Sequence, residues 1–145
     1  MSKKETITKI LKLKDSRKKE LEIEVKKAAD RAETERVKLL ALEKDYNDTL
    51  NVFNEKNIDG SLDASNLSSY YDFLSRIDNK IREQKVVYTK KQDELSAVKR
   101  LLVNAHKDKK VFEIMKEKAV RKEAKARFES EQKEADFFSI SRKSR

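Results

Sequence analysis

The side chains that most often carry out chemistry are scarce in this sequence. His106 is the only histidine and there is no cysteine to join it, so a metal site or a catalytic pair built on these residue types is not expected. The Asp and Glu residues are interspersed with Lys, a pattern expected on exposed helical faces, where carboxylates stay solvated. A phosphate-binding loop needs several glycines, and Gly60 is the only one. We therefore expect a protein that is not an enzyme, with no catalytic residue, metal, cofactor or small-molecule substrate.

The composition points to long helices. Roughly half of the 145 residues are Ala, Glu, Lys, Leu or Arg, which is typical of coiled coils when the apolar residues are periodic. One glycine and no proline exclude folds that need many tight turns, such as sandwiches, barrels and Rossmann units. Because 43% of the residues are charged, the apolar side chains are too few for a globular core and must form a stripe.

Two such stripes are present. Positions spaced alternately by four and three residues are apolar in ten of fourteen cases from Ile7 to Phe53, and in eleven of fourteen from Leu67 to Phe112. This spacing is the a/d seam of a left-handed coiled coil. Residues 54–66 lie between the seams and hold the only glycine with several Asn, Asp and Ser residues. That composition ends one helix and offers Asp63, Ser65 or Asn66 as the N-cap of the next.

These features predict an all-α fold, a two-helix antiparallel coiled-coil hairpin with an overhanging second helix. We expect one domain over residues 1–145, with helix one at about 5–53, a tip loop at about 54–66, helix two at about 67–138 and a flexible tail at 139–145. The seams alone also allow a parallel homodimer. If Phe53 faces Leu67, Leu39 lies near Ile81 and Glu35 lies beside Gln84. The Glu35–Gln84 layer either fixes the register or is simply solvated.

Charge is distributed unevenly along this hairpin. Residues 1–19 carry a net charge of +6 and residues 107–127 a net charge of +5, whereas residues 43–66 carry −4. Folding brings the two basic segments together at the open end, opposite an acidic tip. Such an end favours nucleic acid, anionic lipid or an acidic protein surface, unless it is only a Lys-rich solvated face.

Several apolar side chains lie off the seams. Leu50, Tyr71 and Phe73 are near the tip, where they are expected to contact a partner. The alternative, which is compatible with the first, is that Tyr71 and Phe73 cover the loop around Ile58 and Leu62. At the other end, Phe137, Phe138 and Ile140 form a docking tail or a frayed terminus. The longest purely apolar run, residues 39–42, is far too short to span a bilayer, so a cytosolic protein without a transmembrane segment is expected.

The arrangement resembles the FliJ family of flagellar export proteins and its YscO-type injectisome counterparts. The resemblance rests on residues 70–74, Tyr-Tyr-Asp-Phe-Leu, followed by Ile77, Ile81 and Gln84, and on the Glu-Gln-Lys-Glu-Ala-Asp-Phe-Phe segment at 131–138. It implies a cytoplasmic protein at the inner-membrane export apparatus, similar to the central stalk of rotary ATPases. Its implied partners are the hexameric export ATPase (FliI-like), the export gate protein (FlhA-like) and export chaperones.

The resemblance also suggests where these partners bind. The residues expected to contact the export gate, near the tip, are Tyr46, Leu50, Phe73, Ile77 and Gln84. The basic open end is expected to enter the ATPase ring through Lys14, Lys18, Lys109, Lys110, Lys116, Lys118, Arg121 and Lys122. The alternative is a basic coiled-coil hairpin that binds nucleic acid, which the resemblance makes the less favoured interpretation.

Overall fold

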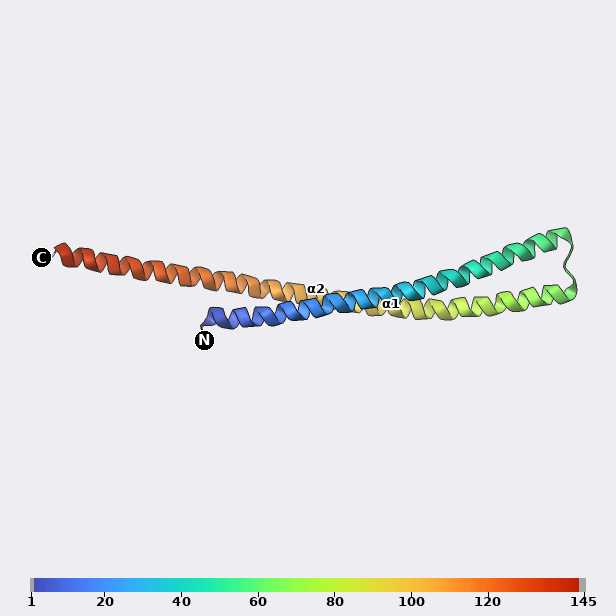
Figure 1. The fold of residues 1–145 in the computed structure, drawn as a ribbon, viewed down its shortest axis with the longest axis horizontal. Helices are drawn as coiled ribbons and strands as arrows, with labels where there is room; N and C mark the ends of the chain where they lie inside the picture. The colour runs from blue at the N-terminus through green and yellow to red at the C-terminus, as the bar shows by residue number, and fades with distance from the viewer. Residues whose placement is uncertain (1, 144–145) are drawn as a thin grey trace. The chain divides into compact units, whose positions relative to one another are not determined.

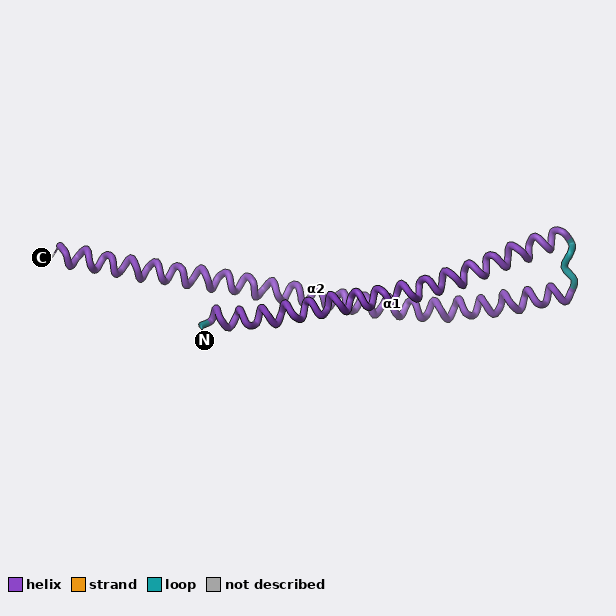
Figure 2. Tube along the Cα trace, viewed as in Figure 1, coloured by secondary structure: helices purple, strands orange, loops and turns teal. Residues whose placement is uncertain are grey.

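The computed structural model describes residues 2–143 and consists of two long helices. Helix α1 comprises Lys3–Asp59, which is 57 residues, and helix α2 comprises Ala64–Lys143, which is 80 residues (Figure 1). The described residues contain no strand, and a single short loop joins the two helices (Figure 2). The predicted all-α, two-helix fold is confirmed.

Helix α1 ends at Gly60 for a reason that the sequence supplies. Gly60 has a φ of 69°, in the left-handed region that only glycine adopts at little cost. Its N–H donates to the carbonyl of Asn57 at 3.3 Å, and the Ser61 N–H donates to the carbonyl of Lys56 at 3.1 Å. These two bonds form a Schellman motif, which satisfies carbonyl groups that the end of the helix leaves without partners.

Helix α2 begins at a side-chain cap. The Asp63 carboxylate accepts a hydrogen bond of 2.7 Å from the Asn66 N–H, and the Asp63 carbonyl accepts one of 3.0 Å from the Leu67 N–H. Of the three residues predicted as possible N-caps, Asp63 therefore takes that position. Ser2 caps α1 in the same way, through a bond of 3.2 Å from the Glu5 N–H to its hydroxyl.

The helix boundaries differ from those expected. Residues 54–59 and 64–66 are helical, so the loop is confined to residues 60–63 and not 54–66. Asn, Asp and Ser are tolerated on the exposed face of a helix, and it is the left-handed glycine that ends α1. Residues 139–143 continue α2, where a tail was expected; Ser144 and Arg145 lie outside the described residues.

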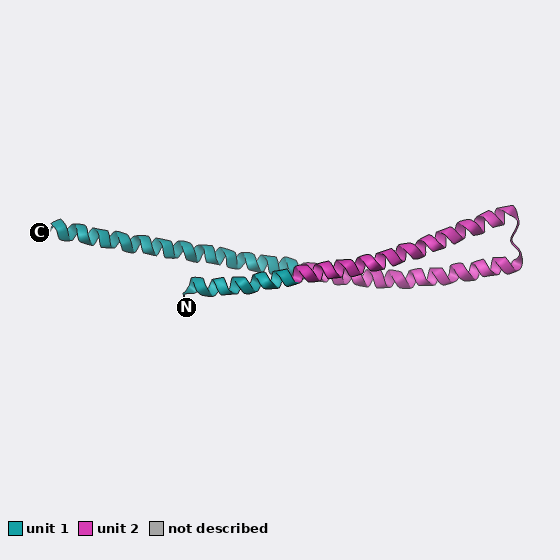
Figure 3. Ribbon diagram, in the orientation of Figure 1, with its two compact units in different colours: residues 1–20, 101–145 teal, residues 21–100 magenta. Residues whose placement is uncertain are grey.

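The chain divides into two compact units, and both helices contribute to each. Unit 2 comprises Leu21–Arg100 and includes the loop, and unit 1 comprises residues 1–20 and 101–145 (Figure 3). In unit 2 the α1 and α2 segments run antiparallel from the loop, and Leu39 packs with Ile77 and Ile81. Because Leu39 and Ile81 come from one chain, the antiparallel hairpin is formed within it, as the predicted register requires.

The predicted seams coincide with the least exposed positions of both helices. Every seam residue from Ile7 to Phe53 and from Leu67 to Phe112 is buried or half-buried. The core is thin: the buried apolar side chains among the described residues are Ile7, Leu21, Ala28, Ala32, Leu39, Ile77 and Ile81. In unit 1, residues 121–143 of α2 are exposed throughout. We call this segment the α2 extension; it is the overhang that the sequence predicts.

Candidate partner-binding surfaces

An aromatic cluster lies next to the loop of unit 2. The ring of Phe53 contacts Tyr70 and Tyr71 edge-on, with centroid distances of 5.8 and 5.9 Å. The Lys56 ammonium lies 5.5 Å from the centre of the Tyr70 ring. Edge-on ring pairs and cation–π contacts orient aromatic side chains as well as burying them. The cluster therefore holds Tyr71 in place although 62% of that residue is exposed.

The exposure of Ile58 distinguishes between the two interpretations of the apolar residues near the loop, which are contact with a partner and a local cap over the loop. Ile58 is 85% exposed and lies within α1, so no aromatic side chain covers it. Tyr71 packs on Phe53 instead, and Phe73 is 39% exposed. Unit 2 thus presents apolar surface to solvent beside the loop, and a local cap over Ile58 is not formed.

The five residues expected to contact the export gate fall into two groups. Phe73 is exposed and Leu50 half-buried. Tyr46 is half-buried and packs against the core cluster of Leu39, Ile77 and Ile81. Ile77 itself is only 6% exposed. The structure therefore brings Tyr46 and Ile77 into the core of the hairpin, while Leu50 and Phe73 remain available to a partner.

Gln84, the fifth residue, belongs to a polar layer within the seam. Its amide nitrogen donates to the backbone carbonyl of Glu35 at 3.0 Å and to the Glu35 carboxylate at 2.5 Å. This hydrogen bond, assisted by Lys38 at 3.3 Å, holds the pKa of Glu35 below its usual value. The structure therefore shows Glu35 and Gln84 bonded to each other across the two helices, and not simply solvated.

In unit 1 the facing helices are joined by charged side chains. Lys14 of α1 pairs with Asp108 of α2 at 2.5 Å, and Lys109 of α2 pairs with Asp15 of α1 at 2.7 Å. The Lys14 ammonium also lies 5.5 Å from the centre of the Phe112 ring. Both lysines occupy seam positions, where their stems are shielded and their charged ends reach an acid on the opposite helix. The two ion pairs therefore hold the helices together at the seam positions of Lys14 and Lys109, where the side chains are not apolar.

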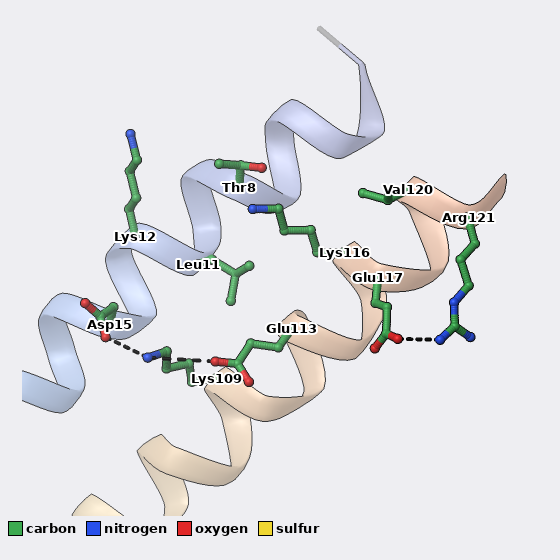
Figure 4. A pocket seen from close by; sticks show the side chains of 10 residues that line it. All are labelled: Thr8, Leu11, Lys12, Asp15, Lys109, Glu113, Lys116, Glu117, Val120 and Arg121. Atoms are coloured by element: carbon green, nitrogen blue, oxygen red, sulfur yellow. Dashed lines mark hydrogen bonds and ion pairs between the residues drawn. The ribbon is translucent and has the colours of Figure 1, made fainter. Parts of the chain in front are cut away.

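Asp15 has the most strongly perturbed carboxyl of this network. Its hydrogen bond with Lys109, and secondly that with Lys19 at 3.0 Å, lowers its pKa from the usual 3.8 to about 2. Lys109 also approaches Glu113 at 3.8 Å, so the ammonium lies between two carboxylates (Figure 4). Asp15 is therefore ionised at any pH at which the protein is expected to work.

A shallow groove of about 650 Å³ lies beside this network. Leu11 points into the space between the helices, and Val120 lies at the end of the groove toward the α2 extension (Figure 4). The groove is lined by Thr8, Leu11, Lys12 and Asp15 of α1 and by Lys109, Glu113, Lys116, Glu117, Val120 and Arg121 of α2. It combines an apolar floor with charged edges, on which four Lys or Arg side chains lie among three Asp or Glu side chains.

The eight residues expected to contact the ATPase ring are all in unit 1, and they differ in how they are engaged. Lys14 and Lys109 form the cross-helix pairs described above. Lys110 lies 3.8 Å from Glu113, and Arg121 pairs with Glu117 one turn away. Lys18 and Lys116 are half-buried, while Lys118 and Lys122 are exposed. The structure thus gathers the predicted basic residues on one unit. A second groove lies between the start of α1 and this part of α2, and Lys3, Lys118 and Lys122 are among the residues that line it.

The cross-helix ion pairs were not predicted from the sequence. A signal for them exists, because Lys14 and Lys109 are among the few charged residues in the seams. The residue that faces each of them on the other helix is next to an acidic residue in the sequence, Asp108 for Lys14 and Asp15 for Lys109. Their assignment required the register of unit 1, which the loop alone does not specify. His106 is exposed, and the residues described contain no group of three or more His, Cys, Asp or Glu side chains placed to hold a metal ion.

Over residues 2–143, no helix is both long and apolar enough to cross a membrane. No curated protein and no solved structure matches the chain at a significant level. One protein family does match: residues 3–145, essentially the whole chain, fit the family described as Flagellar FliJ protein. The long paired helices and the breadth of this match agree with the resemblance found in residues 70–84 and 131–138. The chain belongs to the FliJ family of proteins related to flagellar export.

Proposed function

We propose that this protein is a non-enzymatic central stalk and regulator of the type III flagellar export ATPase. In this role it promotes assembly of the ATPase ring, couples the ring to the export gate and helps to handle export chaperones. It acts in the cytoplasm, at the periphery of the inner membrane where the export apparatus is located. Membership of the FliJ family supports the connection with export.

The observation that carries the proposal is the basic, two-helix construction of unit 1. A stalk within a ring must be slender, and unit 1 is a single pair of helices in which residues 121–143 of α2 are exposed throughout. Lys116, Lys118 and Lys122 lie on the α2 part of this unit. Basic side chains on a slender element favour insertion between acidic surfaces, which a ring lumen can supply from every subunit at once.

The gate contact is proposed for the surface beside the loop of unit 2. Leu50 and Phe73 are its direct contact residues, because they are the predicted residues with accessible apolar surface. Tyr71 is added to them, since it is exposed and held by Phe53. Tyr46, Ile77 and Gln84 act indirectly, by holding the two helices in the register that presents Leu50 and Phe73.

The stalk role is tested by adding the purified chain to the export ATPase and measuring ring assembly and ATP hydrolysis. We expect stimulation by the wild-type chain and loss of stimulation for Lys116→Glu/Lys118→Glu/Lys122→Glu. The matched control is Lys80→Glu/Lys85→Glu/Lys90→Glu, which makes the same change in charge at exposed positions of unit 2. Equal loss in both variants, or stimulation that survives removal of residues 107–127, contradicts the assignment.

The same variants address nucleic-acid binding, the alternative function. A phosphate-binding surface gives an affinity that falls steeply with salt and depends on Lys18, Lys19, Lys109 and Lys110. Lys109 is already paired with Asp15, and Lys19 with the same carboxylate at 3.0 Å, so both would have to exchange partners. Tight, salt-sensitive binding of a DNA duplex without any effect on the ATPase would replace the stalk proposal.

A further inference from the structure

The helix pair of unit 1 has two faces, one on each side of its seams. The four-and-three spacing that defines the seams continues to Lys4 of α1 and Ala126 of α2. A residue directly after a seam position lies on one side of the seam and a residue directly before one lies on the other, because successive residues are about 100° apart around a helix. Thr8 and Asp15, which line the groove in Figure 4, follow seam positions. We call that side the Asp15 face.

The other side of the pair carries two further grooves, of about 300 and 450 Å³. In α1 their lining includes residues that precede seam positions and are seven apart, Lys3, Ile10 and Arg17. In α2 it includes a second such series, Asp108, Met115 and Lys122. Among the described residues, none lines both the groove of the Asp15 face and either of these two. We call this second side the basic face.

The two faces differ in charge. Over residues 3–20 and 101–127, the positions directly after seam positions hold four basic and four acidic residues. The positions directly before seam positions hold two acidic residues, Glu20 and Asp108, and five basic ones, Lys3, Arg17, Lys118, Lys122 and Lys125. Both acids are engaged, Asp108 with Lys14 at 2.5 Å and Glu20 with Arg17 at 3.6 Å. The basic face therefore has a surplus of positive charge, and within residues 2–143 no ion pair engages Lys118, Lys122 or Lys125.

Large apolar side chains project from the basic face. In the same ranges, the positions directly before seam positions hold Ile10, Leu13, Leu101, Val111 and Met115. Leu13 is 71% exposed, Val111 54% and Met115 39%. The matching positions of the Asp15 face hold two large apolar residues, Val103 and Val120. Exposed apolar side chains are thus concentrated on the face that also has the surplus of positive charge.

An anionic membrane surface has the chemistry that this face fits. Helices that lie in a membrane interface bury apolar side chains at the boundary of the headgroups and the acyl chains, and they place Lys and Arg among the lipid phosphates. Leu13 and Val111 are more than half exposed and project from the surface, as insertion requires. Four of the five basic residues are lysines, which are flexible point charges that can follow phosphates in any arrangement, whereas Arg is favoured where a partner presents a fixed carboxylate. These features favour a lipid surface over a folded acidic protein.

We propose that unit 1 binds an anionic membrane surface through its basic face, with the helix pair lying in the plane of the membrane. Leu13, Val111 and Met115 enter the boundary of the acyl chains, and Lys118 and Lys122 contact lipid phosphates. The Asp15 face, with equal numbers of acidic and basic residues, faces away from the membrane. Lys118 and Lys122 are also proposed contacts of the ATPase ring, so the ring and the membrane compete for them. This competition, unlike the lipid contact itself, rests on the proposed function.

The contact is tested by co-sedimentation of the purified chain with vesicles of phosphatidylglycerol and phosphatidylcholine in equal parts. We expect binding that weakens with added salt and is absent for vesicles of phosphatidylcholine alone. Lys118→Glu/Lys122→Glu should lower the affinity about tenfold or more. The matched control is Lys12→Glu/Lys110→Glu, which makes the same change in charge at exposed positions of the Asp15 face. It should lower the affinity by less than about threefold, because its charges are screened from the membrane.

Insertion of the apolar side chains has a separate readout. The chain contains no tryptophan, so a single one introduced by Leu13→Trp reports only on that position. Its fluorescence should shift to shorter wavelengths when the anionic vesicles are added, because the indole ring leaves water. Val103→Trp, at an exposed position of the Asp15 face, is the control and should show no shift. All the substituted residues are exposed, and circular dichroism without vesicles checks that each variant is folded.

A wild-type chain that does not bind the anionic vesicles overturns the proposal. So does an equal loss of affinity in the two charge variants, or a Leu13→Trp spectrum that the vesicles leave unchanged. Full vesicle binding by Lys118→Glu/Lys122→Glu, together with lost stimulation of the ATPase, would assign the basic face to an acidic protein surface instead. The vesicle measurements use no ATPase and the ATPase assay uses no lipid, so either proposal can fail while the other stands.

Discussion

Gln84 of α2 donates two hydrogen bonds to Glu35 of α1, one to the backbone carbonyl at 3.0 Å and one to the carboxylate at 2.5 Å. The two residues are 49 positions apart in the chain. Because Gln84 reaches a backbone atom, the bond is made only when the helices are in this register. A slip of one seam position would leave both polar groups facing apolar neighbours.

Replacing Gln84 by alanine is expected to destabilise unit 2 and loosen its register, because Glu35 loses its partner within the seam. The measurement is a urea titration followed by circular dichroism, with a lower midpoint expected. Gln92→Ala is the control, since Gln92 is exposed and bonds only to Tyr88 on its own helix. A midpoint shift for Gln92→Ala as large as that for Gln84→Ala would show that the cross-helix bond has no special role.

The core of unit 2 is thin, so a single deletion in it should be costly. Ile81 is 8% exposed and packs with Leu39 and Ile77. Ile81→Ala should lower the free energy of unfolding by about 3 kcal/mol, from lost burial and the cavity left behind. Val86→Ala removes atoms from a residue that is 70% exposed, and it should change the free energy of unfolding by less than about 0.5 kcal/mol. Similar losses in the two variants would contradict the burial pattern.

The Asp15–Lys109 pair predicts a specific dependence on pH. The pKa of Asp15 falls from 3.8 to about 2 on folding, so its contribution to stability is complete above pH 3.8 and disappears as the pH falls through about 2. Asp15→Asn should therefore lower the melting temperature at pH 7 but not at the most acidic pH. Melting curves of both proteins across this range measure the difference, and Asp45→Asn, at an exposed position of unit 2, is the control. Parallel curves for wild type and Asp15→Asn would refute the pair's role.

Gly60 should be replaceable only by residues that accept a left-handed backbone. Apart from Gly60 and the residues on either side of it in the chain, no atom lies within 4 Å of a Cβ placed at Gly60, so the obstacle to substitution is conformational and not steric crowding. Gly60→Ala is expected to cost about 1 kcal/mol, and Gly60→Asn less, because Asn adopts positive φ more readily. Equilibrium unfolding of the two variants measures this order, and a more stable Ala variant would contradict it.

Variants of the proposed gate surface should lose affinity for the export gate without losing stability. Leu50→Ala and Phe73→Ala should each weaken binding to the cytoplasmic domain of the export gate, because they remove accessible apolar surface. Their unfolding midpoints should change far less than that of Ile81→Ala. Calorimetric titration measures the affinity, with Val86→Ala as the control. Full affinity in Phe73→Ala would remove that residue from the surface.

Much of this fold follows from the sequence alone. The spacing of four and three from Ile7 to Phe53 and from Leu67 to Phe112 determined which faces are buried, because a helix can turn only one stripe toward its partner. The single glycine determined where the chain reverses, since no other residue type adopts a positive φ so readily. The pairing of Glu35 with Gln84 then follows from the register.

The tertiary structure decided the features that depend on how the two helices meet. Ile77, a predicted gate contact, proved to be 6% exposed, because it lies against Leu39 at the centre of the seam. Lys14 and Lys109, predicted ring contacts, are paired with Asp108 and Asp15 from the other helix. Periodicity shows that a position faces the other helix. Whether a lysine there pairs with an acidic residue or is left to bind another protein depends on the register of the two helices. That register is set by packing along both helices and cannot be determined from either one.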